Sequence, residues 1–92
     1  MYLEIVSPEA TLYKGQVSSV TVPGANGEFQ MLENHAPIVS LLQEGTVRIK
    51  GENGISEDFE DRFQKGADGS LLLPIRSGTV ELKDNKMIVL AD

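Results

Sequence analysis

The sequence has 92 residues, eight basic and fourteen acidic side chains, a formal net charge of -6, and no cysteine. This length suits one domain with a single core, and the lack of cysteine excludes disulfides and thiolate metal sites. The acidic balance, without any cluster of Lys and Arg, argues against binding to nucleic acid or to anionic lipid. The apolar runs LLLPI and MIVLA are far shorter than the ~20 residues that span a bilayer, so any membrane association is expected through a partner.

Alternating apolar and polar residues predict β-strands along most of the chain. In chain order, the alternating segments are YLEIV (2–6), SVTV (19–22), TVRIK (46–50) and TVELK (79–83). A period of two is typical of strands with one buried face. Turn sequences separate the segments, namely PGANG at 23–27, EG at 44–45, KGENG at 50–54, KGADG at 65–69, RSG at 76–78 and KDNK at 83–86. Turns at intervals of about eight to twelve residues predict an all-β sandwich or barrel.

The last of these turns predicts a hairpin with a defined register. Asp84 and Asn85 both tolerate positive φ, so they suit a two-residue hairpin loop. Pairing through this loop sets Leu82 opposite Met87 and places Val80 opposite Val89, with all four on one face. Residues 52–66 are less clear. Phe59 and Phe63 are four apart, which fits either one face of a short helix or one face of a strand.

The polar residues do not form a recognisable catalytic or metal-binding motif. His35 is the only histidine, and no Gly-x-Ser-x-Gly sequence or similar nucleophile motif accompanies it. One His without Cys is a poor zinc site, and the acidic residues at 57–61 lack the spacing of an EF-hand. The glycine-rich segments GANG and GENG do not match a phosphate-binding loop. We therefore predict a non-enzyme without catalytic residues, metal, ATP site or cofactor.

Three segments in order resemble the epsilon subunit of F-type ATP synthases: YLEIVSPEATLYKGQVSSVTVPGANGEF, NHAPIVSLLQEGTVRI and SGTVELKDNKMIVLAD. Any short motif within these segments is weak evidence alone, but together they occur in the family's order and cover residues 2–50 and 71–92. The resemblance implies a flattened ten-stranded, two-sheet β-sandwich over residues 1–92. Relative to the family, residues at about 51–70 are longer and more acidic than the usual strand connection, and we expect an insertion there. It also implies a non-catalytic rotor subunit of the central stalk, which couples proton translocation to ATP synthesis.

The same resemblance implies partners and contact residues. The turn HAP at 35–37 would face the gamma subunit, and Ser7 would lie on the same side of the molecule. The expected gamma contacts are Ser7, Met31, His35, Ala36, Pro37, Ile38 and Val39. The c-ring of the membrane sector would be met by Gly27, Glu28 and Phe29, with Glu28 facing a basic side chain. The link to the alpha/beta catalytic head is indirect. The expected location is the cytoplasmic face of a bacterial inner membrane, as a peripheral protein.

Two departures from the family pattern and two alternatives remain. Gln30, Met31 and Glu33 replace Gly, Ile and Pro, which predicts a different backbone path near Gln30. The chain stops at Asp92, where long relatives continue into two helices, so we expect coupling without inhibition by an inserted helix. Leu32 and Val39 could belong either to the gamma interface or to the core. The alternative function is a stand-alone sandwich that binds a small ligand or carbohydrate in a pocket with convergent polar groups and aromatics.

Overall fold

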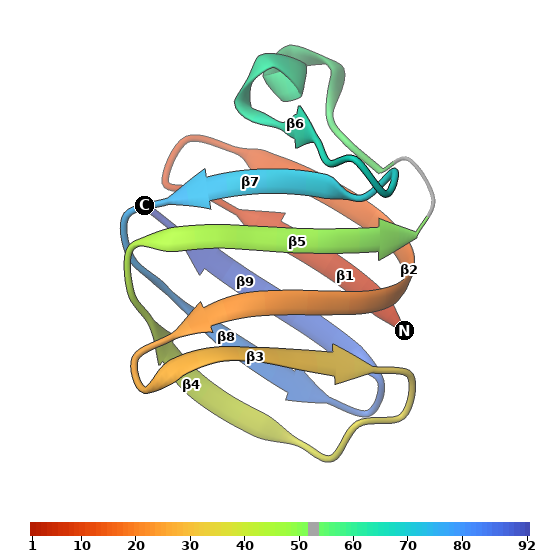
Figure 1. The fold of residues 1–92 in the computed structure, drawn as a ribbon, viewed down its shortest axis with the longest axis vertical. Helices are drawn as coiled ribbons and strands as arrows, with labels where there is room; N and C mark the ends of the chain where they lie inside the picture. Colours follow the sequence, from red (N-terminus) through yellow and green to blue (C-terminus); the bar gives the residue numbers. More distant parts are fainter. Residues whose placement is uncertain (52–53) are drawn as a thin grey trace.

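The computed structural model describes residues 1–51 and 54–92, and these form nine strands and one short 3-10 helix (Figure 1). The elements in chain order are β1 (Tyr2–Val6), β2 (Thr11–Gly24), β3 (Gly27–Leu32), β4 (Ile38–Leu42), β5 (Gly45–Gly51), η1 (Glu57–Arg62), β6 (Gln64–Lys65), β7 (Leu71–Ile75), β8 (Gly78–Lys83) and β9 (Lys86–Ala91). Among the described residues, no helix is long and apolar enough to cross a membrane.

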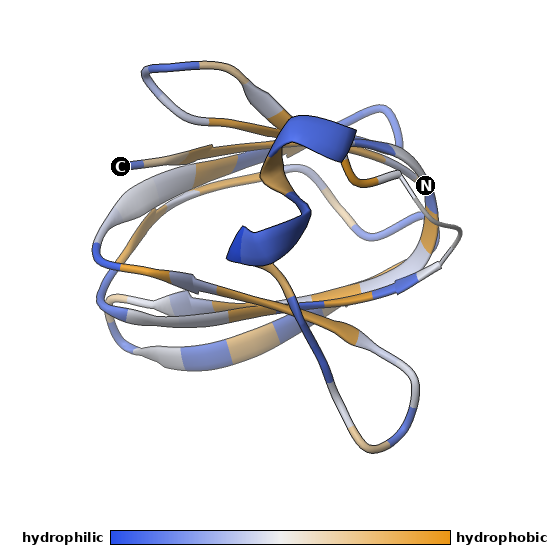
Figure 2. Cartoon of the chain, turned by 90° about the horizontal axis from the view of Figure 1, so that it is seen from above, coloured by the Kyte–Doolittle hydropathy of each residue, from blue (hydrophilic) through white to orange (hydrophobic). Residues whose placement is uncertain are grey.

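The strands are arranged in two layers that face each other. In Figure 1 the near layer has the order β3-β2-β5-β7-β6 and the far layer has the order β1-β9-β8-β4. β1 is parallel to β9, and the other pairs are antiparallel. Figure 2 shows the two layers edge-on. The all-β class and the sandwich architecture are confirmed.

The long strand β2 joins the two layers and explains the strand count. Its first half, from Thr11 to Gln16, pairs with β1, and its second half pairs with β3 and β5. A register shift lies between Val17 and Ser19, and such a bulge bends the strand. Because β2 serves both layers as one continuous strand, the described residues contain nine strands rather than the expected ten.

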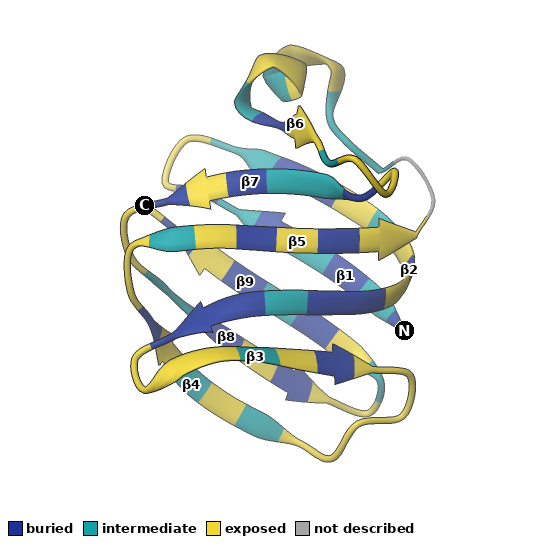
Figure 3. Ribbon diagram, viewed as in Figure 1, coloured by how far each residue is buried: buried dark blue, intermediate teal, exposed yellow. Residues whose placement is uncertain are grey.

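One hydrophobic core lies between the layers. Its completely buried side chains include Tyr13, Leu3, Ile5, Leu73 and Leu82. Figure 3 shows the alternation of buried and exposed residues along β5, where Val47 and Ile49 face the core. This alternation is the pattern that the sequence TVRIK predicts.

The predicted C-terminal hairpin is confirmed in its register. Leu82 pairs with Met87 and Val80 with Val89, and all four side chains are buried. The turn residues Asp84 and Asn85 have φ values of 51° and 62°. The strand bounds predicted for residues 2–6 are also those observed.

Residues 54–70 form a short excursion at the β7 edge of the sandwich. The two phenylalanines share neither a regular helix face nor a strand face: Phe59 lies in η1 at a kink with φ -128° and ψ 17°, and Phe63 follows η1 in extended backbone. The acidic residues of η1 are exposed, and the ribbon of η1 is largely hydrophilic in Figure 2. Phe63 follows η1 and is buried with its ring centroid 6.3 Å from that of Tyr13. The predicted turn at 50–54 includes residues 52 and 53, which lie outside the described residues.

Candidate functional site

The outer side of the far layer carries apolar residues at neighbouring positions. The register sets two rows of side chains across β1, β9, β8 and β4: the first holds Val6, Leu90, Thr79 and Leu41, and the second holds Glu4, Ile88, Glu81 and Val39. The residues between them along each strand are mostly buried, so these rows point away from the core. We call the surface formed by Val6, Val39, Leu41, Ile88 and Leu90 the apolar face.

The apolar face is exposed to solvent to an unusual extent. Val39 is 75% exposed, Leu41 67% and Leu90 52%, whereas Val6 and Ile88 are half-buried. Antiparallel layers with one solvated side normally have polar residues on that side. The apolar residues of β9 and β4 lie on either side of β8, whose outward residues Thr79 and Glu81 are polar. Exposed apolar residues gathered on one side of such a layer are typical of a protein-binding site.

The predicted contact residues in β3 and β4 divide between this surface and the core. Val39 belongs to the apolar face, and Ile38 is partly buried against the core. The prediction that Met31 contributes to a binding surface is wrong, because its side chain is completely buried opposite Val20. Leu32 is 53% exposed on the outer side of the near layer, so neither Leu32 nor Val39 is a core residue.

The loop between β3 and β4, residues 33–37, presents His35, Ala36 and Pro37 to solvent. The backbone N–H of His35 donates to the carbonyl of Leu32 at 3.1 Å, and its ring Nδ1 lies 2.7 Å from the carbonyl oxygen of Ala36. These contacts fix a turn. Neither joins the imidazole to a nucleophile or a carboxylate, as a catalytic His requires.

Ser7 and His35 lie at opposite ends of the sandwich, whereas the resemblance implies that both are on the side that faces gamma. β1 begins with Tyr2 next to the β8–β9 turn, which contacts the His35 loop, and it runs away from that turn. Ser7 therefore follows the far end of β1, and its hydroxyl is used within its own turn, where it donates to the carbonyl of Ala10 at 3.2 Å. Its side chain is 5% exposed and offers little surface to a partner.

The three residues predicted to meet the c-ring lie at the same end as Ser7. Gly27 ends the β2–β3 turn with φ 122°, a conformation that requires glycine. Glu28 is exposed, whereas Phe29 is half-buried and packs against the core. Gln30 pairs with Thr21 inside the regular part of β3, which does not indicate an unusual path there. Glu28 is therefore the charged group of this set that a partner could reach.

Sequence reasoning missed Leu41 and Leu90, two of the most exposed members of the apolar face. The signal was present in MIVLA, where Met87 and Val89 are buried while Ile88 and Leu90 face outward. A strand that is apolar on both sides predicts that both sides are covered. The sequence could therefore have shown a second apolar side on β9.

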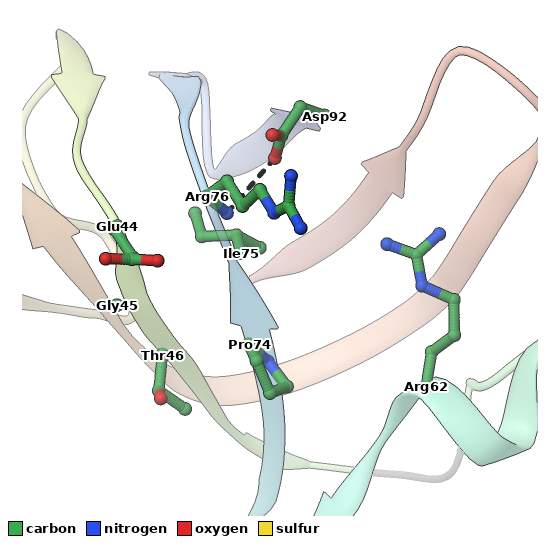
Figure 4. A pocket seen from close by; sticks show the side chains of 8 residues that line it. All are labelled: Glu44, Gly45, Thr46, Arg62, Pro74, Ile75, Arg76 and Asp92. Atoms are coloured by element: carbon green, nitrogen blue, oxygen red, sulfur yellow. Dashed lines mark hydrogen bonds between the residues drawn. The ribbon is translucent and has the colours of Figure 1, made fainter.

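A pocket of about 560 Å³ lies at the end of β7, and none of its lining residues belongs to the apolar face (Figure 4). Its lining includes the side chains of Glu44, Arg62, Arg76 and Asp92, and Arg62 faces it from η1. Two backbone N–H groups, of Arg76 and Ser77, donate to the Asp92 carboxylate at 3.1 Å and lower its pKa. No aromatic ring lines this pocket, so it lacks the stacking surface that a sugar site uses.

Comparison with known proteins decides the family. The profile described as "ATP synthase, Delta/Epsilon chain, beta-sandwich domain" matches residues 1–60. The chain is 37% identical over 90 residues to the ATP synthase epsilon chain of Chlorobaculum tepidum, covering 98% of this chain and 86% of that one. The chain belongs to the ATP synthase epsilon-chain family.

Other members of the epsilon-chain family are longer. The chain is 35% identical to the epsilon chain of Campylobacter concisus and spans all of its own length but 60% of that relative. Among solved structures it resembles a chain of the Tetrahymena thermophila mitochondrial ATP synthase central stalk and c-ring, with a TM-score of 0.69 at 17% identity over 99% of this chain and 62% of that one. A chain of the Euglena gracilis mitochondrial ATP synthase gives a TM-score of 0.72, also at 17% identity, and covers 97% of this chain and 48% of that one. These likenesses show the fold.

Membership of the epsilon-chain family also decides between the functions considered from the sequence. The interpretation as a free-standing ligand or carbohydrate module is not supported, since the relatives are ATP synthase epsilon chains and the pocket lacks aromatic groups. Within the part of the chain that the structure describes, no three acidic or histidine side chains are grouped as metal ligands.

Proposed function

We propose that this chain is a non-catalytic subunit of the rotor of an ATP synthase and that it binds the gamma subunit with its apolar face. The observation that carries this proposal is the exposure of Val39, Leu41 and Leu90 on one side of one layer. The family supports the assembly, because the relatives are epsilon chains and one structural neighbour comes from a central stalk and c-ring. The chain itself would supply binding surfaces and no chemistry.

The energetics favour the apolar face as the source of affinity. Complete burial of a Val or Leu side chain contributes roughly 1.5–3 kcal/mol relative to full exposure. Three side chains that are half to three-quarters exposed therefore provide several kcal/mol when a partner covers them. A stable interface buries about 1,200–2,000 Å² in total, so the partner must also cover neighbouring residues. The exposed loop that carries His35, Ala36 and Pro37 leads directly into β4 and is the natural extension of this surface.

We further propose that the β2–β3 turn faces the c-ring through Glu28. This turn lies at the end of the sandwich opposite the His35 loop, so the two partners would approach different parts of the molecule. An exposed ion pair contributes only about 0.2–1 kcal/mol. Glu28 would therefore orient the subunit, and gamma would hold it.

The location follows from this role. A rotor subunit between gamma and the c-ring lies at the membrane surface on the side of the catalytic head. In a bacterium this side is the cytoplasmic face of the inner membrane, and the complex would hold the chain there as a peripheral protein.

A pair of leucines on opposite faces provides the test. Leu90 and Leu32 have almost equal exposure, 52% and 53%, but Leu90 belongs to the apolar face and Leu32 to the outer side of the near layer. Leu90→Glu places a charge at the proposed interface and is expected to weaken gamma binding on the order of 100-fold, because a charge buried without a partner is costly. Leu32→Glu, with the same change of charge, is expected to leave the affinity within about threefold. Titration of purified gamma measures both, and equal effects would contradict the assignment of the face.

A further inference from the structure

Three segments that are distant in sequence meet beside the His35 loop. They are the N-terminus with Tyr2, the β3–β4 loop at Glu33 and Asn34, and the β8–β9 turn at Asn85. Figure 1 shows this loop and this turn side by side at the lower right. The amino group of Met1 also donates to the Glu33 carboxylate. The contacts connect the near layer, which ends with β3, to the far layer.

Asn85 is the centre of these contacts. Its side-chain Oδ1 accepts a hydrogen bond from the backbone N–H of Asn34 at 2.9 Å, and its Nδ2 donates to Oε2 of Glu33 at 3.0 Å. Its own carbonyl accepts from the N–H of Tyr2 at 3.0 Å. One amide thus holds two successive residues of the loop with a donor and an acceptor. Donors from Met1 and Asn85 lower the pKa of Glu33, which keeps it ionised as the acceptor.

The loop needs such an anchor because it joins two strands of different layers. β3 pairs with β2, and β4 pairs mainly with β8, so no ladder runs between the two strands that the loop connects. Residues 33–37 are all exposed. A loop held in one conformation binds more tightly, because less conformational entropy is lost on association.

We infer that Asn85 is a positioning residue for gamma binding: its side chain holds the β3–β4 loop in the conformation in which His35, Ala36 and Pro37 meet the partner. This inference rests on the proposed function and adds a residue that does not itself need to touch gamma. The conformation of the turn does not explain the choice of asparagine, because glycine adopts positive φ at least as readily.

The neighbouring residue Asp84 is the matched control. It also has positive φ, 51° against 62° for Asn85, and lies in the same turn. Asn85→Gly keeps the backbone conformation and removes both side-chain hydrogen bonds to the loop. Asp84→Gly removes a side chain that makes no hydrogen bond or ion pair with Glu33 or Asn34. A double variant adds a rescue. Asn85→Asp places a carboxylate against Glu33, and adding Glu33→Gln restores the hydrogen bond with donor and acceptor exchanged.

The experiment combines amide hydrogen exchange in the isolated chain with titration of gamma. With Asn85→Gly we expect the protection of the His35 amide to fall at least about tenfold and the affinity for gamma to fall about three- to tenfold, as expected for the loss of one or two hydrogen bonds. Asp84→Gly is expected to change both by less than twofold. Asn85→Asp is expected to weaken binding, and the double variant to recover most of the loss.

The outcomes separate this inference from the proposed function. The inference fails if Asn85→Gly lowers the exchange protection of the Asn34 amide alone. In that case the protection of the His35 amide and the affinity for gamma stay within twofold of the original chain, and Asn85 is only a turn residue. If the original chain does not bind gamma, the proposed function fails. The exchange of His35 then decides alone whether Asn85 positions the loop.

Discussion

The two outer faces of the sandwich differ in composition although the same chain builds both. On the near layer, the outward residues of β2, β3 and β5 include Thr21, Gln30 and Arg48, which are polar and accessible to water. There Lys50 pairs with the Asp68 carboxylate at 3.3 Å. On the far layer, the corresponding positions of β4 and β9 carry the exposed side chains of the apolar face.

This difference shows where a partner is needed. The near layer largely follows the usual division of an antiparallel sheet, with apolar residues inward and polar residues outward, and Leu32 and Leu72 are apolar exceptions on its outer side. The far layer is apolar on both sides over β4 and β9, which leaves hydrophobic surface in water unless another protein covers it.

A double substitution within the apolar face should have the largest effect. Val39→Glu with Leu41→Glu places two charges at the proposed gamma interface and is expected to lower the affinity on the order of 1,000-fold. The matched control, Gln30→Glu with Thr46→Glu, adds the same charge to the outer side of the near layer and should change the affinity less than about threefold. Calorimetric titration with gamma measures both. An equal loss in the control would mean that total charge, rather than the face, determines binding.

Adjacent residues of β3 separate core packing from surface exposure. Met31→Ala is expected to lower the free energy of unfolding by about 2–4 kcal/mol, because Met31 is completely buried and its loss leaves a cavity. Leu32→Ala should change it by less than about 0.5 kcal/mol, since Leu32 is 53% exposed. Urea unfolding of the isolated chain gives both values. Similar values for the two variants would contradict the assignment of inner and outer positions.

The charge at the β2–β3 turn should have a smaller effect on assembly. Glu28→Gln keeps the size of the side chain and removes its charge, and we expect binding of the chain–gamma complex to a purified c-ring to weaken by about 0.2–1 kcal/mol. Because an exposed ion pair is screened by salt, the difference should shrink at high ionic strength. Glu57→Gln, on η1, serves as the control. An unchanged affinity at low salt would remove Glu28 from the c-ring contact.

The ionisation of Asp68, beside Lys50 of the near layer, should make the stability of the fold depend weakly on pH. The Ser70 hydroxyl and backbone N–H donate to Asp68, with Lys50 also nearby, and lower its pKa well below the usual range. A lowered pKa in the folded state means that ionised Asp68 stabilises the fold above about pH 4, and that this contribution is lost as the pH falls further. Asp68→Asn should therefore reduce the loss of stability between pH 7 and pH 3. The urea midpoint at both pH values checks this, with Asp61→Asn as control; an unchanged difference for Asp68→Asn would contradict the prediction.

Local patterns were enough to predict much of the fold. The alternation in TVRIK and TVELK, and the pair Asp84 and Asn85, predicted strands and a hairpin register that depend on neighbouring residues alone. The region around Phe59 and Phe63 could not be assigned, because a spacing of four fits both a helix and a strand. Phe63 packs near Tyr13, which is 50 residues earlier in the chain, and spacing within the segment does not reveal such a long-range contact.

The candidate site depended more on contacts between distant segments. Val39 was expected at the interface, and its side chain is exposed. Met31 was also expected there but is buried, because a resemblance between motifs does not say which side of β3 faces inward. Ser7 was expected on the same side as His35 because the family resemblance turns both toward gamma, but the direction of β1 in the layer sets them at opposite ends.

Strand periodicity, turn chemistry and ordered motifs are local properties of the chain, so the all-β class, the C-terminal hairpin and the family could be predicted from them. The folded chain was needed to show which apolar residues remain in water and which segments meet at Asn85. Both depend on the order, direction and register of strands far apart in sequence, and the path of β2 through both layers sets that arrangement.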